Sequence, residues 1–190
     1  MVGGRGRDKV FGGPGSDKLY GDFVVATSRR ASGRRGDRIH GGDGNDQSFG
    51  GAGRDKMSGG KGDDVQYGGA GRDVIFANRG VDTSFGGDGN DTLWALAKSD
   101  VTAPGDLIGD TLVGGNGNDT FRVRDGEVDK VTCGDGSHDR LFADQYDVIT
   151  DPTAADPTGS CELVERKDAT TQSAVDEDKT ESSGQDSKEG

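Results

Sequence analysis

The sequence predicts an all-β fold in which short strands and turns wind into a stacked coil. A nine-residue phrase, Gly-Gly-x-Gly-x-Asp-x-apolar-x, recurs over most of the 190 residues. Only 28% of residues are hydrophobic and 36 are glycine, which leaves too little side-chain volume for a conventional core. A fixed short period is typical of solenoid proteins, in which each repeat contacts only its neighbours.

The aspartate at position six of the phrase gives the register. Uninterrupted copies of the phrase are Gly41–Phe49, Gly50–Ser58, Gly59–Tyr67 and Gly68–Phe76. Further copies are Gly3–Phe11, Gly12–Tyr20, Gly86–Trp94 and Gly114–Arg122. The position-six residues are Asp8, Asp17, Asp37, Asp46, Asp55, Asp64, Asp73, Asp82, Asp91, Asp110, Asp119 and Asp129. Asp139 also fits the pattern, and the sequence leaves open whether it belongs to this set.

Two longer spacings predict loops that leave the coil. Asp37 follows Asp17 by 20 residues and Asp110 follows Asp91 by 19, whereas the other spacings between Asp37 and Asp91 are nine. Because the register resumes afterwards, the extra residues must leave through a turn as surface loops. We expect these loops at about 21–31 and 95–104.

An 18-residue period lies on top of the nine-residue one and predicts two repeats per coil. Position eight should face inward, because side chains alternate along a strand. One column at this position reads Ile39, Met57, Ile75 and Leu93, and the other reads Ser48, Gln66 and Ser84. The residues that follow the second column, at position nine, are Phe49, Tyr67 and Phe85. Either the small polar residues point inward, or a shifted register buries the aromatic ones.

The same turn residues predict a metal site. Glycine at positions one, two and four permits positive φ values, so that successive carbonyl oxygens point into one pocket. Calcium takes six to eight oxygen ligands at about 2.3–2.6 Å, and the position-six aspartate adds a charged one. We therefore predict that several Ca²⁺ ions are bound by the twelve aspartates, together with glycine carbonyls such as those of Gly42, Gly44, Gly51, Gly53, Gly60, Gly62, Gly69, Gly71, Gly87 and Gly89.

Stacking places the next equivalent turn 18 residues later, so that each ion can lie between two turns. The predicted carboxylate pairs are Asp37/Asp55, Asp46/Asp64, Asp55/Asp73, Asp64/Asp82 and Asp73/Asp91. If the loops only bulge outward, the rows extend through Asp8/Asp37, Asp17/Asp46, Asp82/Asp110, Asp91/Asp119 and Asp110/Asp129. Without metal these rows would repel each other, so we expect calcium binding to be coupled to folding.

Charge and hydropathy exclude several classes of partner. The net charge is −12, and Asp outnumbers Glu by 29 to 6, which suggests short carboxylates placed at turns. Such a chain should not bind nucleic acid, and its apolar runs are too short to span a membrane. Met1 is followed at once by a repeat that begins at Gly3, with no visible signal peptide. We therefore expect part of a longer chain.

The two cysteines, Cys133 and Cys161, flank the end of the repeats. This placement favours a disulfide that closes the last turn and an oxidising compartment, the alternative being two free thiols. We expect three parts: a calcium-binding roll at 1–132, a disulfide-closed cap at 133–165, and a disordered acidic tail at 166–190.

Two weaker signals have simpler interpretations. Arg35-Gly36-Asp37 spells an integrin-type adhesion tripeptide, but Asp37 is already explained as a position-six ligand. The only histidines, His40 and His138, have no partner constellation for a zinc site or a nucleophile triad. The sequence therefore does not predict an enzyme.

The phrase resembles the repeat of the hemolysin-type, repeats-in-toxin (RTX) calcium-binding family. The resemblance covers Gly3–Thr132, about two thirds of the chain. It implies a parallel β-roll, a β-helix-like solenoid with calcium in its turns, in a protein exported from a bacterium. The segment from Val131 to Glu162 is similar to the end of secreted actinobacterial proteins of this group. Departures from the repeat occur at Arg35, at Ala77-Asn78 and at Asp106-Leu107-Ile108.

Two functions follow as hypotheses. The first is a secreted, non-enzymatic calcium-binding roll that serves as a structural or interaction module, with a partner that the sequence does not name. The alternative is the calcium-dependent accessory or secretion domain of a larger exported enzyme or toxin, such as a protease, lipase or cytolysin. A third, an adhesin, rests on the tripeptide alone.

Overall fold

A computed structural model describes residues 1–4, 6–22, 36–95, 109–150 and 160–167. Most of the two predicted loops, at 23–31 and 96–104, and most of the predicted tail, at 168–190, lie outside these residues. The division into roll, cap and tail therefore stays a prediction. Among the described residues, no helix is long and apolar enough to cross a membrane.

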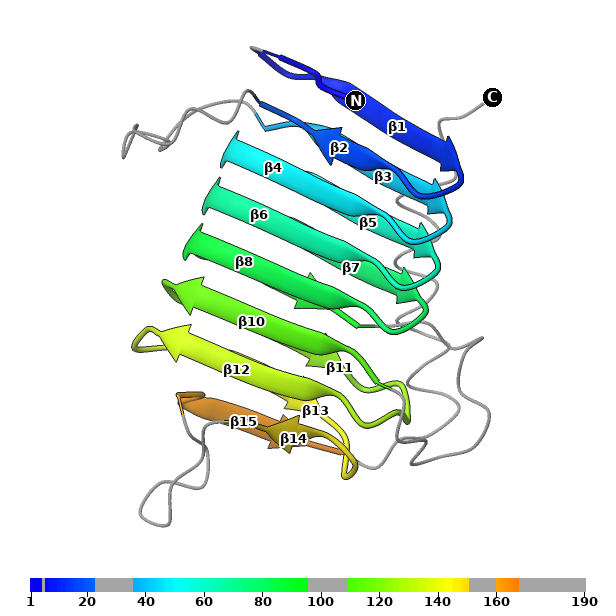
Figure 1. The fold of residues 1–190 in the computed structure, drawn as a ribbon. Coiled ribbons are helices and arrows are strands. Elements are labelled where there is room, and N and C mark those ends of the chain that lie inside the picture. Colours follow the sequence, from blue (N-terminus) through cyan, green and yellow to red (C-terminus); the bar gives the residue numbers. More distant parts are fainter. Residues whose placement is uncertain (5, 23–35, 96–108, 151–159, 168–190) are drawn as a thin grey trace.

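All regular structure in the described residues is β, in two parallel sheets (Figure 1). The odd sheet contains β1 (Lys9–Pro14), β3 (Arg38–Asp43), β5 (Lys56–Lys61), β7 (Val74–Arg79), β9 (Thr92–Trp94), β11 (Thr120–Val123), β13 (Arg140–Ala143) and β15 (Leu163–Arg166). The even sheet contains β2 (Lys18–Tyr20), β4 (Gln47–Gly53), β6 (Val65–Gly71), β8 (Thr83–Gly89), β10 (Thr111–Asn116), β12 (Lys130–Asp135) and β14 (Val148–Ile149). The predicted parallel β-roll is confirmed.

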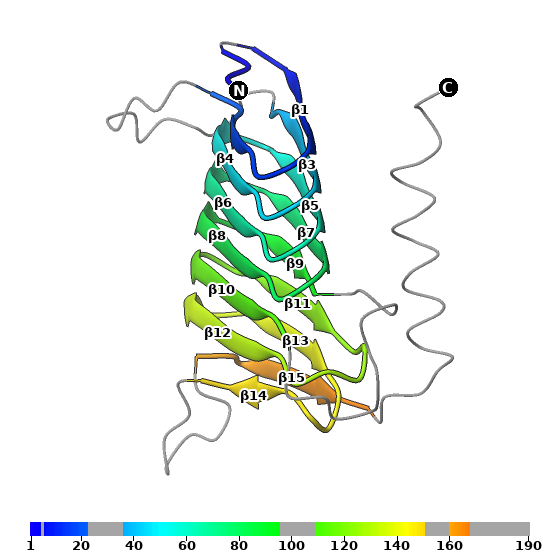
Figure 2. The ribbon, with the colours of Figure 1, turned by 45° about the vertical axis from the view of Figure 1, so that its right-hand side comes forward.

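Successive strands alternate between the two sheets, so one coil consists of two repeats, as predicted. Each strand pairs with the strand two further along the chain, and Met57 is aligned with Ile39 on one side and Ile75 on the other. Figure 2 shows the resulting stack of coils. The pairing also spans both extra segments, since Val10 is aligned with Ile39 and Ser84 with Leu112.

The core lies between the sheets as two facing columns of side chains. The odd sheet contributes the predicted aliphatic column, whose members are at most 2% exposed: Ile39, Met57, Ile75 and Leu93. The even sheet contributes Ser48, Gln66 and Ser84, also at most 2% exposed. Of the two alternatives at this face, the small polar residues therefore point inward.

Hydrogen bonds explain how a glutamine can occupy the core. The side-chain amide of Gln66 lies 3.0 Å from the carbonyl oxygen of Phe76 and 3.0 Å from the nitrogen of Gly59, so it can donate to the first and accept from the second. Outside the sheet, the half-buried rings of Phe49, Tyr67 and Phe85 stack at centroid distances of 4.9 Å. The aromatic residues thus stabilise the outer face through contacts between neighbouring strands.

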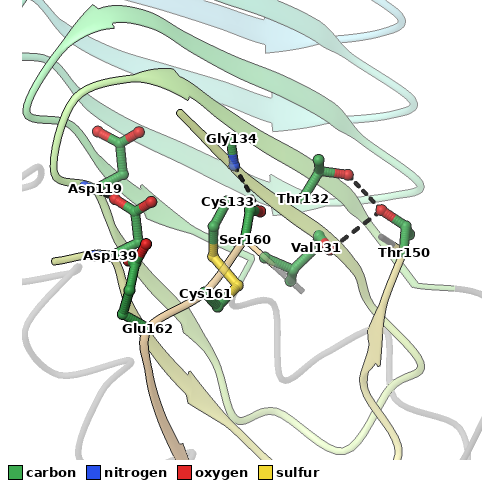
Figure 3. The surroundings of a disulfide bond; sticks show 10 residues. All are labelled: Asp119, Val131, Thr132, Cys133, Gly134, Asp139, Thr150, Ser160, Cys161 and Glu162. Carbon is green, nitrogen blue, oxygen red and sulfur yellow. Dashed lines mark hydrogen bonds between the residues drawn. A yellow bond between two sulfur atoms is a disulfide. The ribbon is translucent and has the colours of Figure 1, made fainter. Parts of the chain in front are cut away.

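At the C-terminal end, a disulfide joins Cys133 on β12 to Cys161, just before β15 (Figure 3). Both cysteines are 0% exposed, and the N–H of Gly134 donates to Ser160 Oγ over 2.8 Å beside them. The predicted disulfide is therefore confirmed over two free thiols. It links the last coil to the coil before it, because β13 pairs with β15 and β12 with β14.

Candidate metal centres

The turns adopt the backbone conformation that the glycines were expected to permit. All ten glycines predicted to offer carbonyl ligands have φ values between 105° and 155°. A Cβ on Gly60 would also lie 2.0 Å from the carbonyl oxygen of Gly42, and one on Gly69 would lie 2.2 Å from that of Gly51. The carbonyl oxygens of one turn are thus directed at the next turn, which only a glycine can approach so closely.

The position-six aspartates form two rows, one along each edge of the roll. The first row lies at the turns that lead from the even to the odd sheet: Asp8, Asp37, Asp55, Asp73, Asp91, Asp119 and Asp139. The second row lies at the turns that lead from the odd to the even sheet: Asp17, Asp46, Asp64, Asp82, Asp110 and Asp129. All predicted carboxylate pairs are neighbours within these rows.

A repeated hydrogen bond joins the members of each row. The backbone N–H of each aspartate donates to Oδ1 of the next aspartate in the row, at 2.6–2.8 Å from Asp8 to Asp139 and from Asp17 to Asp129. One oxygen of each accepting carboxylate is therefore committed to the protein backbone. The other oxygen, Oδ2, takes no part in this bond.

The Oδ2 atoms are buried in places that offer them no hydrogen bond. Among the described residues, buried Oδ2 atoms that accept none belong to Asp8, Asp46, Asp55, Asp64, Asp73, Asp91, Asp119, Asp129 and Asp139. A buried carboxylate oxygen without a partner is costly, and a bound cation is one of the few groups that can compensate for it. This pattern along both edges is the observation that fits calcium best.

A second type of oxygen converges on the same places. A Cβ built on Gly41 would lie 2.3 Å from Asp46 Oδ2 and 2.3 Å from the carbonyl oxygen of Gly59. At Gly86 the corresponding distances to Asp91 Oδ2 and to the carbonyl oxygen of Gly114 are both 2.6 Å. At these two turns a carboxylate oxygen and a carbonyl oxygen of the next coil thus lie close together, and both are of the type that a hard cation prefers. The carbonyl belongs to a glycine at position one of its repeat, whereas the sequence predicted the carbonyls of positions two and four.

Burial raises the pKa values of these carboxylates. Desolvation raises the pKa of Asp55 to about 6, of Asp64 to about 7 and of Asp73 to about 8, although the hydrogen bond from the preceding aspartate's N–H opposes the shift. Repulsion from the neighbouring aspartate in the row adds to the increase. A cation between the turns would favour the charged carboxylates that burial disfavours.

Both rows end in carboxylates that the sequence did not assign. The N–H of Asp139 donates to Glu162 Oε2 over 2.7 Å, and the N–H of Asp129 donates to Asp147 Oδ1 over 3.2 Å. Figure 3 shows Asp119, Asp139 and Glu162 following one another down the stack. Asp139, left open by the sequence, is therefore a full member of the first row. Glu162 and Asp147 were missed because no glycine phrase precedes them.

Of the three departures from the repeat, the structure describes only the one at Ala77-Asn78. Asn78, which replaces a glycine, adopts a φ of 80°, so the turn keeps its positive φ value. Asn is among the residues that tolerate this region best. Arg35 and the segment 106–108 lie outside the described residues. Asp37 is 3% exposed and accepts the hydrogen bond from Asp8, so the carboxylate of the adhesion tripeptide lies inside the roll.

A parallel roll of glycine turns with buried carboxylates along both edges defines a repeat protein of the cation-binding class. The family model of the RTX calcium-binding nonapeptide repeat matches in four copies, at residues 1–23, 32–57, 58–93 and 105–127. These matches cover more than half of the chain, which therefore belongs to the RTX calcium-binding repeat family. Neither a curated protein nor a solved structure matches the chain.

Proposed function

We propose that the chain is a secreted bacterial module whose roll folds when calcium ions bind between its turns. Each ion would be held by position-six carboxylates of adjacent coils and by glycine carbonyls of the same turns. The proposed ligands are the twelve predicted aspartates and Asp139, with the carbonyls of the glycines at positions two and four. Bound calcium would neutralise the rows and join each coil to the next.

The buried Oδ2 atoms carry this proposal. Asp55, Asp73 and Asp91 follow one another in the first row, each at most 2% exposed, and each has an Oδ2 atom that accepts no hydrogen bond from the described residues. Removing several like charges from water without a counterion is strongly unfavourable. The folded state should therefore depend on a cation to reach appreciable population at neutral pH.

The core offers little to compensate for this repulsion. In the middle of the roll, Ser48, Gln66 and Ser84 occupy inward positions where aliphatic side chains would contribute more hydrophobic stabilisation. Folding coupled to calcium suits a protein that meets calcium only after export, since extracellular modules bind it in the range of about 10⁻⁴–10⁻³ M. The Cys133–Cys161 disulfide supports an oxidising, extracellular compartment.

The proposal assigns the roll a structural or interaction role and no catalytic one. Its test is circular dichroism of the chain in a chelator, followed by addition of millimolar Ca²⁺, with calorimetry to count the bound ions. We expect the β signal to appear only with calcium and several ions to bind. An equal β signal in both conditions would refute coupled folding.

A further inference from the structure

We propose that the outer face of the odd sheet binds a linear acidic polysaccharide. Residues at position eight of each repeat are buried, and those at positions seven and nine form the outer face of each sheet. In the described strands β1 to β13 of the odd sheet, these two positions carry no carboxylate and five basic side chains, namely Lys9, Arg38, Lys56, Arg122 and Arg140. The whole chain has a net charge of −12, so this face is opposite in sign to the chain as a whole.

The charges of the roll are separated by their position in the repeat. The position-six carboxylates lie along the two edges, where calcium would neutralise them under the proposed function. On the even sheet, positions seven and nine of the described strands β2 to β12 carry only two basic side chains, Lys18 and Lys130, and no acid. An anionic partner is therefore attracted most strongly to the odd face.

The basic residues of the odd face form an elongated strip. Lys9 is aligned with Arg38, and Arg38 with Lys56, on three adjacent strands. Arg122 and Arg140 follow on β11 and β13. With about 4.8 Å between strands, the strip runs for about 29 Å from β1 to β13, whereas positions seven and nine lie only about 7 Å apart along a strand. A long, narrow strip of charge fits an extended polymer better than a compact ligand.

Basic side chains at both ends of the strip are free to meet a partner. Lys9, Arg38 and Arg140 are exposed, and they form no ion pair with a carboxylate among the described residues. Their charges are therefore not neutralised within the part of the chain that the structure describes.

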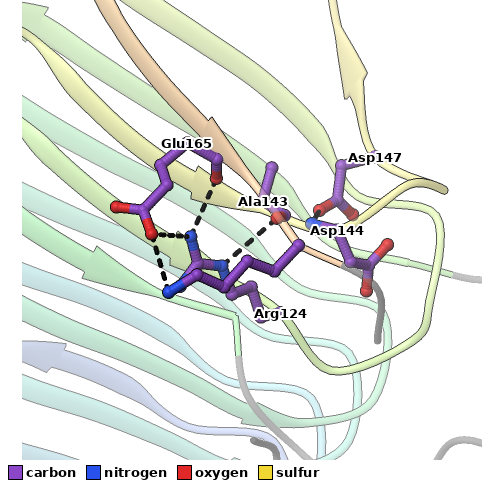
Figure 4. Close-up of polar contacts among 6 residues, drawn as sticks. Arg124, Ala143, Asp144, Asp147 and Glu165 are labelled. Atoms are coloured by element: carbon purple, nitrogen blue, oxygen red, sulfur yellow. Dashed lines mark hydrogen bonds and ion pairs between the residues drawn. The ribbon is translucent and has the colours of Figure 1, made fainter. Parts of the chain in front are cut away.

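The one acid at position seven or nine of the described odd sheet is already paired. It is Glu165 on β15, whose carboxylate lies 3.3 Å from the guanidinium of Arg124 and 2.8 Å from the ammonium group of Lys167. Figure 4 shows the side chain of Arg124 extending toward Glu165. This carboxylate therefore subtracts little from the positive charge of the face.

Aromatic rings hold the guanidinium of Arg122 in place. It lies 4.7 Å from the ring centroid of Trp94 and 5.0 Å from that of Phe142, the aligned residues on the two neighbouring strands. Phe76 stacks with Trp94 from the next strand, at a centroid distance of 5.7 Å. Because the protein's own side chains occupy these ring faces, the face suits sugar carboxylates or sulfates that accept from charged N–H groups. It suits single-stranded nucleic acid less, since bases stack on open rings.

An anionic membrane is the other extended partner of this charge. Binding to a lipid surface adds exposed apolar side chains to the basic ones, because these enter the layer below the headgroups. From β3 to β13, the described residues at positions seven and nine include no exposed hydrophobic side chain, and Phe76 is only 7% exposed. The face thus offers charge along its length and favours a charged polymer.

The proposal names a partner for the interaction role of the proposed function, on which it rests only for the folded roll. Its test measures, by calorimetry in saturating Ca²⁺, the binding of dextran sulfate to the full chain, with uncharged dextran of the same length as the control polymer. The face variant is Lys9→Gln/Arg38→Gln. The matched control, Lys18→Gln/Lys130→Gln, removes the same charge from exposed position-seven residues of the even sheet.

We expect dextran sulfate to bind and dextran not to bind. The face variant should weaken binding by roughly tenfold, because two exposed charge contacts are lost, and the control variant should weaken it by about twofold at most. Added salt should weaken the binding of dextran sulfate to all three chains, since it screens exposed charges. Equal losses in the two variants would overturn the proposal, because net charge and not the odd face would then control binding.

Circular dichroism in Ca²⁺ separates this proposal from the proposed function. A chain that folds with calcium but does not bind dextran sulfate would refute the polysaccharide partner and leave calcium-coupled folding intact. Vesicles of an anionic phospholipid and a single-stranded DNA oligonucleotide are measured in the same way. If either binds more tightly than dextran sulfate and loses affinity in the face variant, that partner replaces the polysaccharide and the proposal is wrong. Should a double variant not form the roll, Arg140→Gln against Lys130→Gln gives the same comparison with one charge.

Discussion

The backbone N–H of Asp46 donates to Oδ1 of Asp64 over 2.7 Å, while Oδ2 of Asp64 is buried and accepts no hydrogen bond from the described residues. One oxygen of this carboxylate thus holds the preceding coil, and the other is the one that we propose binds an ion. The two roles can be separated by substitution.

The first prediction concerns Asp64→Asn. Asparagine can keep the hydrogen bond from Asp46 through its Oδ1, but it places an NH₂ group where the ion needs an oxygen. We expect the calcium concentration at half folding to rise by roughly tenfold or more, since changes near a metal that leave its direct ligands intact already cost about 10- to 100-fold in affinity. The measurement is circular dichroism during a calcium titration.

The control for this prediction is the adjacent residue. Asp63→Asn removes the same charge from an exposed side chain whose Oδ1 accepts the N–H of Val81, a bond that asparagine preserves. It should change the titration midpoint much less than Asp64→Asn. Equal shifts for both variants would mean that general charge, and no specific ligand, controls folding.

The second prediction concerns pH in the absence of calcium. Burial raises the pKa of Asp55, Asp64 and Asp73 from 3.8 to about 6, 7 and 8, so the folded state binds protons more tightly than the unfolded chain. Stability of the calcium-free roll is therefore greatest below pH 4 and is lost as pH rises through 6 to 8. In chelator, the β signal should be larger at pH 4.5 than at pH 8.

Calcium should reverse this dependence, because protons compete with the ion for the same carboxylates. The calcium midpoint should therefore rise as pH falls from 8 toward 5. A midpoint that does not change over this range would show that the buried aspartates are not the ligands.

The third prediction separates two reasons for glycine in the turns. Gly13 and Gly69 have φ values of 100° and 111°, but a Cβ would meet nothing within 4 Å at Gly13 and the Gly51 carbonyl oxygen at 2.2 Å at Gly69. Gly13→Ala should cost about 1–2 kcal/mol of unfolding free energy, the cost of a left-handed conformation. Gly69→Ala should cost clearly more, because adjacent turns must also move apart.

Denaturant unfolding in saturating calcium measures both values. The calcium stoichiometry of Gly69→Ala is expected to fall as well, because the displaced carbonyl of Gly51 is a proposed ligand. Equal destabilisation by the two variants would argue against tight contact between the turns.

The fourth prediction concerns the disulfide. Cys133 and Cys161 are 28 residues apart, and closing a loop of this length contributes about 3–4 kcal/mol in the chain-entropy description. The Cys133→Ser/Cys161→Ser variant should therefore unfold at lower denaturant concentration than the oxidised chain. Reduction of the unaltered chain serves as the control and should give the same loss. No effect of either treatment would mean that the other contacts of β15 suffice to hold the last coil.

The sequence predicts the repeating part of the fold and the two rows of aspartates well, because the repeat contains the signals for both. Position-six aspartates give the register, and the columns through Met57 and Gln66 reveal two repeats per coil. The direction of Gln66 was left open, since alternation alone does not say whether a polar or an aromatic residue faces inward. Its hydrogen-bond partners, Gly59 and Phe76, are brought close only by stacking.

The parts that sequence reasoning missed lie where the glycines end. Glu162 and Asp147 complete the rows from segments with irregular spacing, so only the pairing of β15 and β14 reveals them. Asp125 and Glu127, each with a carboxylate oxygen within 4.8 Å of one of Asp129, did leave a signal, namely acids at alternate residues before Asp129. These acids occupy positions two and four, where the repeat pattern predicts glycine, so the pattern alone does not identify them.

The alternation of strands between the two sheets limits how this protein can change length. Duplicating a single nonapeptide would move every later repeat to the opposite sheet. Aliphatic core residues equivalent to Met57 would then stack on polar ones equivalent to Gln66, and every later carboxylate would lie on the opposite edge. Duplicating two nonapeptides together preserves both columns. In evolution and in design alike, the roll can therefore grow or shrink by whole coils only, in steps of 18 residues.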